Sequence, residues 1–123
     1  MTTKEIADRF VALCRQGNFE TAQKELFDRD IISIEPYATA TFGKETKGLD
    51  ALQEKARKFT AMIEQVHSLN LSDPLVAGDA FACAMRLEVT IKGHGKMLLD
   101  ELCIYEVKAG KIVSERFTSR FPV

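Results

Sequence analysis

The hydrophobic pattern of this sequence changes from a mainly helical to an alternating period near residue 65, and that change limits the folds open to the chain. Before it, apolar residues such as Ile6, Phe10 and Leu13 recur three or four positions apart, which is typical of amphipathic helices. After it, from Val66 to Phe121, apolar and polar residues alternate, which is typical of strands with one buried face. Helices followed by a run of strands favour an α+β fold with an antiparallel sheet over a parallel α/β fold.

Three helices are expected in the N-terminal half of the chain. Thr2 and Glu5 have the spacing of a capping box, in which each side chain caps the other residue's backbone N–H. Gly17 is expected to end this first helix, because glycine adopts the left-handed conformation freely at that position. A second helix follows Asn18, a good N-cap residue, and a third begins after Gly48.

The strands are separated by recognisable turn residues. Gly93-His94-Gly95 and Lys108-Ala109-Gly110 predict tight hairpins, whereas the segment from Tyr37 to Lys47 has no periodicity and reads as a surface loop. The last three strands are longer than average, so they must coil and bend, and one face of the sheet becomes concave. The expected strands are Ile31–Glu35, Val66–Leu71, Ala80–Lys92, Lys96–Val107 and Lys111–Phe121.

Composition and charge exclude several classes of protein. The 123 residues correspond to one domain, 1–123, and the formal net charge of −1 comes without the basic face that nucleic acid requires. No apolar run approaches the roughly 20 residues that cross a bilayer, and the N-terminus lacks the pattern of a signal peptide. The three cysteines lie among apolar residues, which indicates reduced packing groups in a cytoplasmic protein.

Strand alternation places several polar residues on otherwise apolar faces. His67, Asp100 and Glu115 each interrupt the set that should pack against the helices, and Glu35 is a fourth candidate at the end of its short strand. A carboxylate on such a face is costly unless it is paired or lines a wet cavity. Two interpretations remain open: a satisfied buried network, or a functional site, where titratable clusters concentrate.

Several segments together resemble the SnoaL-like branch of the nuclear transport factor 2-like superfamily. They are Leu26–Asp30 leading into Ile34-Glu35-Pro36, the helix start Lys47–Leu52, the run Asp100–Tyr105, and the run Gly110–Phe117. The resemblance covers the chain from the first helix to Phe121. It implies a cone-shaped α+β barrel in which three helices pack on a strongly curved sheet around an internal pocket. It also implies a homodimer through the outer sheet face, which Ala82, Ala84, Cys103 and Tyr105 would suit.

The resemblance to ketosteroid isomerases within that superfamily extends to only part of their machinery. Glu35 before Pro36 matches the position of their general base. Phe10 stands where their oxyanion tyrosine would lie and has no hydroxyl, and their second oxyanion acid falls at about Leu102, two residues from Asp100. Epoxide hydrolases of the superfamily need an arginine where this chain has Leu98. Both specific activities are therefore disfavoured.

The expected ligand is a small, mostly apolar carbonyl compound, and no cofactor is expected. As an isomerase or cyclase, the protein would use Glu35 as the base and protonated Asp100 or His67 as the donor to an enolate. The alternative is a non-catalytic ligand-binding or dimerisation module, in which the same residues only orient a ligand. Lys44 and Lys47 near the pocket mouth are candidates to attract an anionic substrate. The expected pocket lining is Phe10, Phe59, Leu87, Leu102, Glu115 and Phe117.

Two further kinds of site receive little support from the sequence. His67, Asp100 and Glu115 match no standard metal-ligand spacing, so no metal is expected. Cys14, Cys83 and Cys103 have no histidine beside them, which disfavours thiol catalysis.

Overall fold

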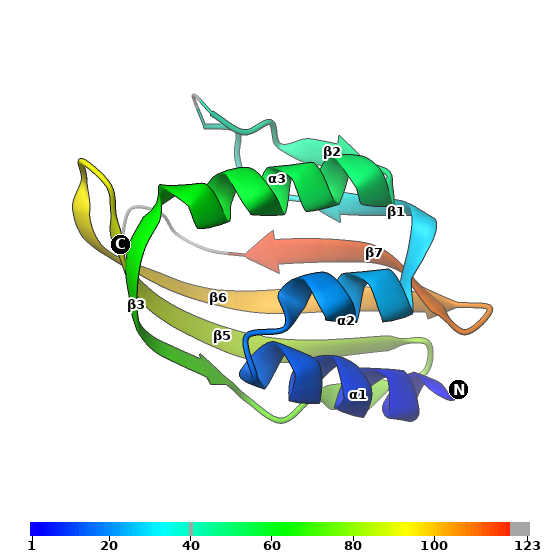
Figure 1. The fold of residues 1–123 in the computed structure, drawn as a ribbon. Helices are drawn as coiled ribbons and strands as arrows, with labels where there is room; N and C mark the ends of the chain where they lie inside the picture. Colours follow the sequence, from blue (N-terminus) through cyan, green and yellow to red (C-terminus); the bar gives the residue numbers. More distant parts are fainter. Residues whose placement is uncertain (40, 119–123) are drawn as a thin grey trace.

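The protein combines three helices with one curved sheet (Figure 1). The computed structural model describes residues 1–39 and 41–118. No helix in these ranges is both long and apolar enough to cross a membrane. The helices are α1 (Thr3–Arg15), α2 (Phe19–Leu26) and α3 (Leu49–Met62). The strands are β1 (Phe27–Ile34), β2 (Glu45–Lys47), β3 (Ile63–Leu71), β4 (Leu75–Ala77), β5 (Ala80–Ile91), β6 (Gly95–Lys108) and β7 (Lys111–Thr118).

The strand order of the sheet is β2-β1-β7-β6-β5-β3, with β4 added beside β5. All neighbouring strands run antiparallel except β1 and β7, which are parallel. The expectation of a purely antiparallel sheet is therefore wrong in one pair. β1 reaches β7 through the rest of the chain rather than through a hairpin, so no tight turn forces the two strands into opposite directions.

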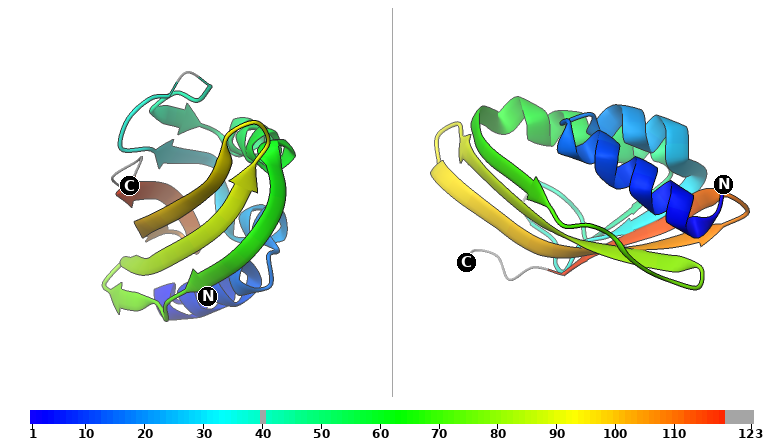
Figure 2. Two further views of the ribbon diagram at one scale, coloured as in Figure 1. Left: turned by 90° about the vertical axis from the view of Figure 1, so that its left-hand side faces the viewer. Right: turned by 90° about the horizontal axis from the view of Figure 1, so that it is seen from below.

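All three helices lie on the concave side of the sheet, whose long strands bend around them (Figures 1 and 2). This arrangement confirms the α+β fold and the cone-like shape, although hydrogen bonds do not close the sheet into a barrel. The inner face carries two apolar clusters. The larger joins α1 and α2 to the strands through Phe10, Ile31 and Phe81, and the smaller surrounds Leu87, Val89 and Ile91 near the end of α3.

The helix-boundary signals act largely as the sequence predicts. The Glu5 N–H donates to the Thr2 hydroxyl at 3.1 Å and the Thr2 N–H donates to the Glu5 carboxylate at 2.9 Å, so the capping box is present. Gly17 follows the helix with φ of 79°, a conformation that favours glycine. Asn18 is the N-cap of α2, but its side-chain amide bonds Gln16 instead of the helix backbone.

Two short strands lie where the sequence gives no periodic signal. β2 occupies the end of the segment expected to be a surface loop, and β4 follows the break at Asp73-Pro74. Each has only three residues, too few for an alternating pattern, and each is held by backbone pairing to a longer neighbour. The hairpins after β5 and β6 lie at the predicted turns. The predicted C-terminal part of the last strand, 119–121, lies outside the described residues.

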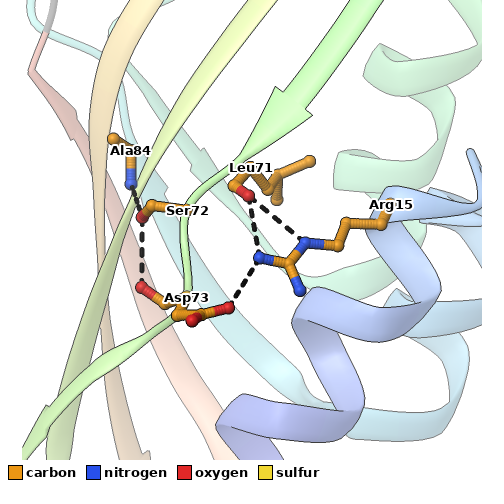
Figure 3. A network of polar contacts seen from close by, with 5 residues as sticks. All are labelled: Arg15, Leu71, Ser72, Asp73 and Ala84. Atoms are coloured by element: carbon orange, nitrogen blue, oxygen red, sulfur yellow. Dashed lines mark hydrogen bonds and ion pairs between the residues drawn. The ribbon is translucent and has the colours of Figure 1, made fainter.

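Arg15 at the end of α1 ties that helix to the chain between β3 and β4 (Figure 3). Its guanidinium donates to the Leu71 carbonyl at 2.9 and 3.2 Å and to the Asp73 carboxylate at 2.8 Å. The Ser72 hydroxyl then accepts from the Ala84 backbone N–H at 2.8 Å, which joins the same segment to β5. The Arg15 side chain thus connects the end of α1 with the segment that joins β3 to β4.

Replacing Arg15 with Met should lower the free energy of unfolding by about 1 kcal/mol, because the Leu71 carbonyl loses its charged donor. Replacing Asp73 with Ala removes only an ion pair whose acidic side chain is 91% exposed, so the loss should stay below about 0.5 kcal/mol. Urea unfolding of both variants measures the difference. Equal losses would mean that the carbonyl contact contributes nothing beyond the surface ion pair.

Candidate functional site

The pairing of β6 with β5 decides which β6 side chains face the helices. Phe81 pairs with Tyr105 and Cys83 with Cys103, and all four residues are buried. Because directly opposed residues point to the same face, the next pair along the ladder puts Glu101 on the inner face, opposite Met85. Glu101 therefore lies on the inner face, where the sequence alternation predicts its neighbours Asp100 and Leu102 instead.

Asp100 and Leu102 consequently lie on the outer face, and the prediction that they line an inner pocket is wrong. The Asp100 side chain is 51% exposed and faces Arg86 across the ladder, with 3.7 Å between carboxylate and guanidinium. Leu102 is 44% exposed. The physical reason is that both faces of β6 are apolar, so alternation alone could not identify the buried one.

His67 also points away from the helices, contrary to the prediction. The register between β3 and β5 shifts between Val66 and Ser68, and this irregularity turns the intervening histidine outward. Its Nε2 lies 2.6 Å from the Thr90 hydroxyl on an exposed part of the strand pair. His67, Asp100 and Glu115 therefore do not come together. Among the described residues, no group of three or more histidine, cysteine or acidic side chains is placed to hold a metal ion.

Glu115 on β7 lies on the inner face, as the strand alternation predicts, and is only 4% exposed. The Ser33 hydroxyl on β1 donates to its Oε1 at 2.8 Å. The parallel pairing of the two strands sets Ser33 directly opposite Glu115, so this contact follows from the register. Phe117, two residues further on, shares the face and is partly buried.

Glu35 follows the last residue of β1 and is held from two sides. Lys55 on α3 donates to its carboxylate at 2.9 Å, with the two side chains 18% and 27% exposed, respectively. The Glu35 backbone N–H donates to the Lys44 carbonyl at 2.7 Å. The carboxylate therefore lies under α3, on the helix side of the sheet, and pairs with a partly buried lysine.

Glu35, Glu101 and Glu115 form an acidic cluster with Lys55 as its cation. Burial raises the pKa of Glu101 to about 7, Glu35 adds to the rise, and Lys55 opposes it. Burial likewise raises the pKa of Glu115 to about 7, against the effect of its bond from Ser33 and of Lys55. The negative charges of Glu35 and Glu101 raise the Glu115 pKa further. The three carboxyls therefore interact electrostatically, although they come from different strands.

The deep end of the inner face is closed by aromatic rings. Phe10 packs on Phe27 and on Tyr105, with ring centroids 5.7 and 4.8 Å apart, and Tyr105 stacks on Phe81 at 4.8 Å. Burial raises the pKa of the Tyr105 hydroxyl well above its usual value. Phe10, at 4% exposure, is thus part of the core.

The remaining expected wall residues lie in the smaller apolar cluster. Leu87 is a buried member of that cluster, and Phe59 on α3 is partly buried against it. Between the two clusters, the inner face carries the Met85–Glu101 pair. The acidic cluster thus interrupts the apolar lining midway along the cone.

Two surface grooves lie beside Glu35 and Lys55. A groove of about 510 Å³ opens where β1 and β7 end, and Glu35 and Phe117 are among its lining residues. A second groove, of about 300 Å³, lies between the 41–46 segment and α3 and includes Lys55. Glu35 therefore borders the first groove, and its partner Lys55 borders the second.

Sequence reasoning missed Glu101, Lys55, Ser33 and Tyr105. The hairpin register could have placed Glu101 and Tyr105 on the inner face. Once the turn pairs Ile91 with Gly95, the partner of every other residue in β5 and β6 follows. Lys55 and Ser33 have no such signal, since their partners are 20 and 82 residues away in the sequence.

Comparison with known proteins supports one family. A family model described as a SnoaL-like domain matches residues 1–119. A crystal structure from Mesorhizobium loti, provisionally named a SnoaL-like polyketide cyclase with carbohydrate phosphatase as a second label, is 34% identical. Its TM-score is 0.89, and the match covers 97% of this chain and 100% of that one. A comparison with curated protein sequences finds no match.

More distant structures share the fold. A protein from Xanthomonas campestris with a cystatin-like fold is 19% identical, with a TM-score of 0.79 and coverage of 97% of this chain and 91% of its own. A protein from Catenulispora acidiphila with a ketosteroid isomerase-like fold, in complex with trimethylamine, is 21% identical. Its TM-score is 0.73, with coverage of 98% and 88%, respectively. With the fold, the family model and the Mesorhizobium loti structure in agreement, the chain belongs to the SnoaL-like domain family.

Proposed function

We propose that the protein binds a small carbonyl compound on the inner face of its sheet and transfers protons on it, as an isomerase or cyclase. The observation that carries the proposal is the acidic cluster, in which one carboxylate pairs with Lys55 and two others have a pKa of about 7. Neighbouring carboxyls in unlike environments are the usual basis of an acid and base assignment. The names of the fold relatives are compatible with this class of reaction.

The roles divide according to environment. Glu35, in contact with an ammonium group, is the base that removes a proton from the carbon next to the carbonyl. Glu101, partly exposed on the inner face and protonated up to about pH 7, donates to the carbonyl oxygen as negative charge develops there. Return of the proton from Glu35 to a different carbon completes an isomerisation without an added reactant. These residues replace Asp100 and His67, which face outward.

Glu115 has a positioning role in this scheme. It is too buried to meet a ligand directly, and its carboxyl already accepts from Ser33. Its charge state changes the field felt by the two other carboxyls, because all three interact.

A non-catalytic ligand-binding module of the same fold is the second candidate. Two observations favour it: Glu35 is already engaged by Lys55, and Phe10, where the related isomerases need a hydroxyl, is committed to the aromatic core. In such a module the acidic cluster would only orient the ligand. Turnover therefore separates the two candidates.

We also propose that two copies of the chain pair through the outer sheet face. Cys103 and Tyr105, which the sequence predicts on that face, are buried on the inner face instead. The support comes from Leu102, exposed on β6, with Leu98 and Ile104 partly exposed beside it on the same face. Apolar side chains in the middle of a solvent-facing sheet are typical of a surface that another protein covers.

Incubation with 3-cyclohexen-1-one in D2O should exchange the protons next to the carbonyl and produce the conjugated isomer, both followed by proton NMR. Replacing Glu35 with Gln should slow exchange about 10²- to 10⁴-fold, because the amide cannot accept the proton. Replacing Glu101 with Gln should slow it about a hundredfold. Glu106→Gln, on the exposed outer face of the same strand, is the matched control. Binding of the ketone without exchange would favour the module.

The stability of the protein should fall as the pH rises from about 4.5 to about 7. In this window the unfolded chain releases the Glu115 proton, ordinarily at pH 4.5, while burial makes the folded chain keep it. At about 1.4 kcal/mol per pKa unit, the effect is on the order of 3–4 kcal/mol. Glu115→Gln should therefore match the native protein at pH 4 and exceed its stability at pH 8. Urea unfolding across pH measures this, with Glu106→Gln as the control. An unchanged pH dependence in Glu115→Gln would contradict the assignment.

Replacing Leu102 with Asp should convert a dimer into monomers, because a carboxylate would be buried in the apolar contact. Light scattering after size-exclusion chromatography reports the mass. Val66→Asp, at a 55% exposed site on β3 away from the centre of the sheet, is the control and should leave the mass unchanged. A native protein that is monomeric at micromolar concentration would refute the proposed contact.

A further inference from the structure

The groove at the ends of β1 and β7 has residues of both sheet faces in its lining. Asp100 and Arg116 come from the outer face, whereas Glu35 and Phe117 come from the inner one. The groove therefore reaches around the end of the sheet, and its volume of about 510 Å³ lies in the range of small-molecule sites. Since Glu35 also belongs to the acidic cluster, a ligand in this groove would extend to the proposed base.

Within the part of the chain that the structure describes, the acidic residues that line this groove have partners of opposite charge, whereas the basic residues do not. Both lining acids already have a cation: Glu35 contacts Lys55 at 2.9 Å, and Asp100 lies 3.7 Å from Arg86. Lys44 and Arg116 also line the groove, and neither forms an ion pair or a side-chain hydrogen bond within residues 1–39 and 41–118. Among the described lining residues, two cations are thus available to an anion, and each carboxylate has a cation beside it.

We propose that this groove holds the carboxylate of an organic acid, so that the compound reaching the inner site is an oxo acid with its carbonyl some distance from the acid group. The inference rests on the proposed function for the carbonyl end of the ligand. Arg116 offers the planar fork of donors that suits a carboxylate, and Lys44 adds a second positive charge from the opposite segment. Phe117 and Pro36 give the groove an apolar wall for the carbon frame.

A single negative charge fits this groove better than a double one. The formal charges of the four charged lining residues, Glu35, Lys44, Asp100 and Arg116, cancel, so a group with two negative charges meets more repulsion from the acids than a group with one. The structure therefore favours a monocarboxylate over a phosphate monoester, which carries close to two charges at neutral pH.

The test compares 3-oxocyclohexane-1-carboxylate with 3-oxocyclohexane-1-carboxamide, which has nearly the same shape and no charge. Amide-resolved NMR titration of the full chain gives both dissociation constants, and cyclohexyl phosphate provides the dianion arm. We expect the carboxylate to bind about tenfold more tightly than the carboxamide. Arg116→Gln should remove most of that preference and Lys44→Gln part of it. Lys108→Gln, an exposed cation in the hairpin between β6 and β7, is the control and should leave it unchanged.

Three results would overturn the inference: equal affinity for acid and amide, a preference for the phosphate, or a preference that survives Arg116→Gln. Because Arg116 lies on the face proposed for dimerisation, the mass of each variant is measured alongside. A variant that becomes monomeric while keeping its preference for the acid would assign the guanidinium to the subunit contact instead.

The two proposals can fail separately. An Arg116-dependent preference for the acid, without proton exchange in D2O, would refute catalysis and leave the anion groove intact. Exchange on the neutral ketone that depends on Glu35, without any preference for the acid, would do the reverse.

Discussion

The antiparallel ladder between β5 and β6 is the interaction on which the arrangement of the site depends. It runs without a register shift from Ala80 opposite Glu106 to Ile91 opposite Gly95. Because facing residues share a side of the sheet, this one ladder brings Phe81, Cys83, Cys103 and Tyr105 against the helices together. A slip of one residue would exchange the inner and outer faces of β6, bury Asp100 and expose Tyr105. The same ladder carries Glu101 into the interior, so fold and site share one determinant.

The inner face combines an aromatic core with a cluster of acidic side chains. Its deep end is aromatic and dry, with Phe10 and Tyr105 in contact. Midway along, three carboxyls share one lysine, and burial favours the protonated form of two of them. Their neutral form reduces the electrostatic cost of placing acids on an apolar face. At the same time it keeps a proton available inside the protein near neutral pH, which an ordinary surface glutamate does not provide.

Much of the fold could be predicted from the sequence because the relevant signals are local. The capping box at Thr2, the glycine after α1 and the two hairpins each depend on a few adjacent residues. The errors have physical causes of another kind. The outward turn of His67 follows from a one-residue irregularity in a strand, which no periodic pattern reveals. β2 and β4 are too short to alternate, and the parallel pairing of β1 with β7 joins distant parts of the chain.

The candidate site was predictable only in part for related reasons. Glu35 and Glu115 stand out because a carboxylate follows or interrupts an apolar run. Glu101 does not stand out, since its strand is apolar on both faces and only the hairpin register distinguishes them. Lys55 is one of two lysines on α3, and nothing in the sequence singles out the one that reaches Glu35.

The short backbone bond between Glu35 and Lys44 has a geometric consequence. The N–H of the proposed base donates to the carbonyl of the proposed anion-binding lysine at 2.7 Å, across the start of the β1–β2 pairing. The backbones of the two residues are therefore fixed relative to each other, and only their side chains and that of Arg116 can adjust the span between a bound acid group and the base. The reach of these side chains would limit the length of carbon frame between the carboxylate and the carbonyl of an oxo acid.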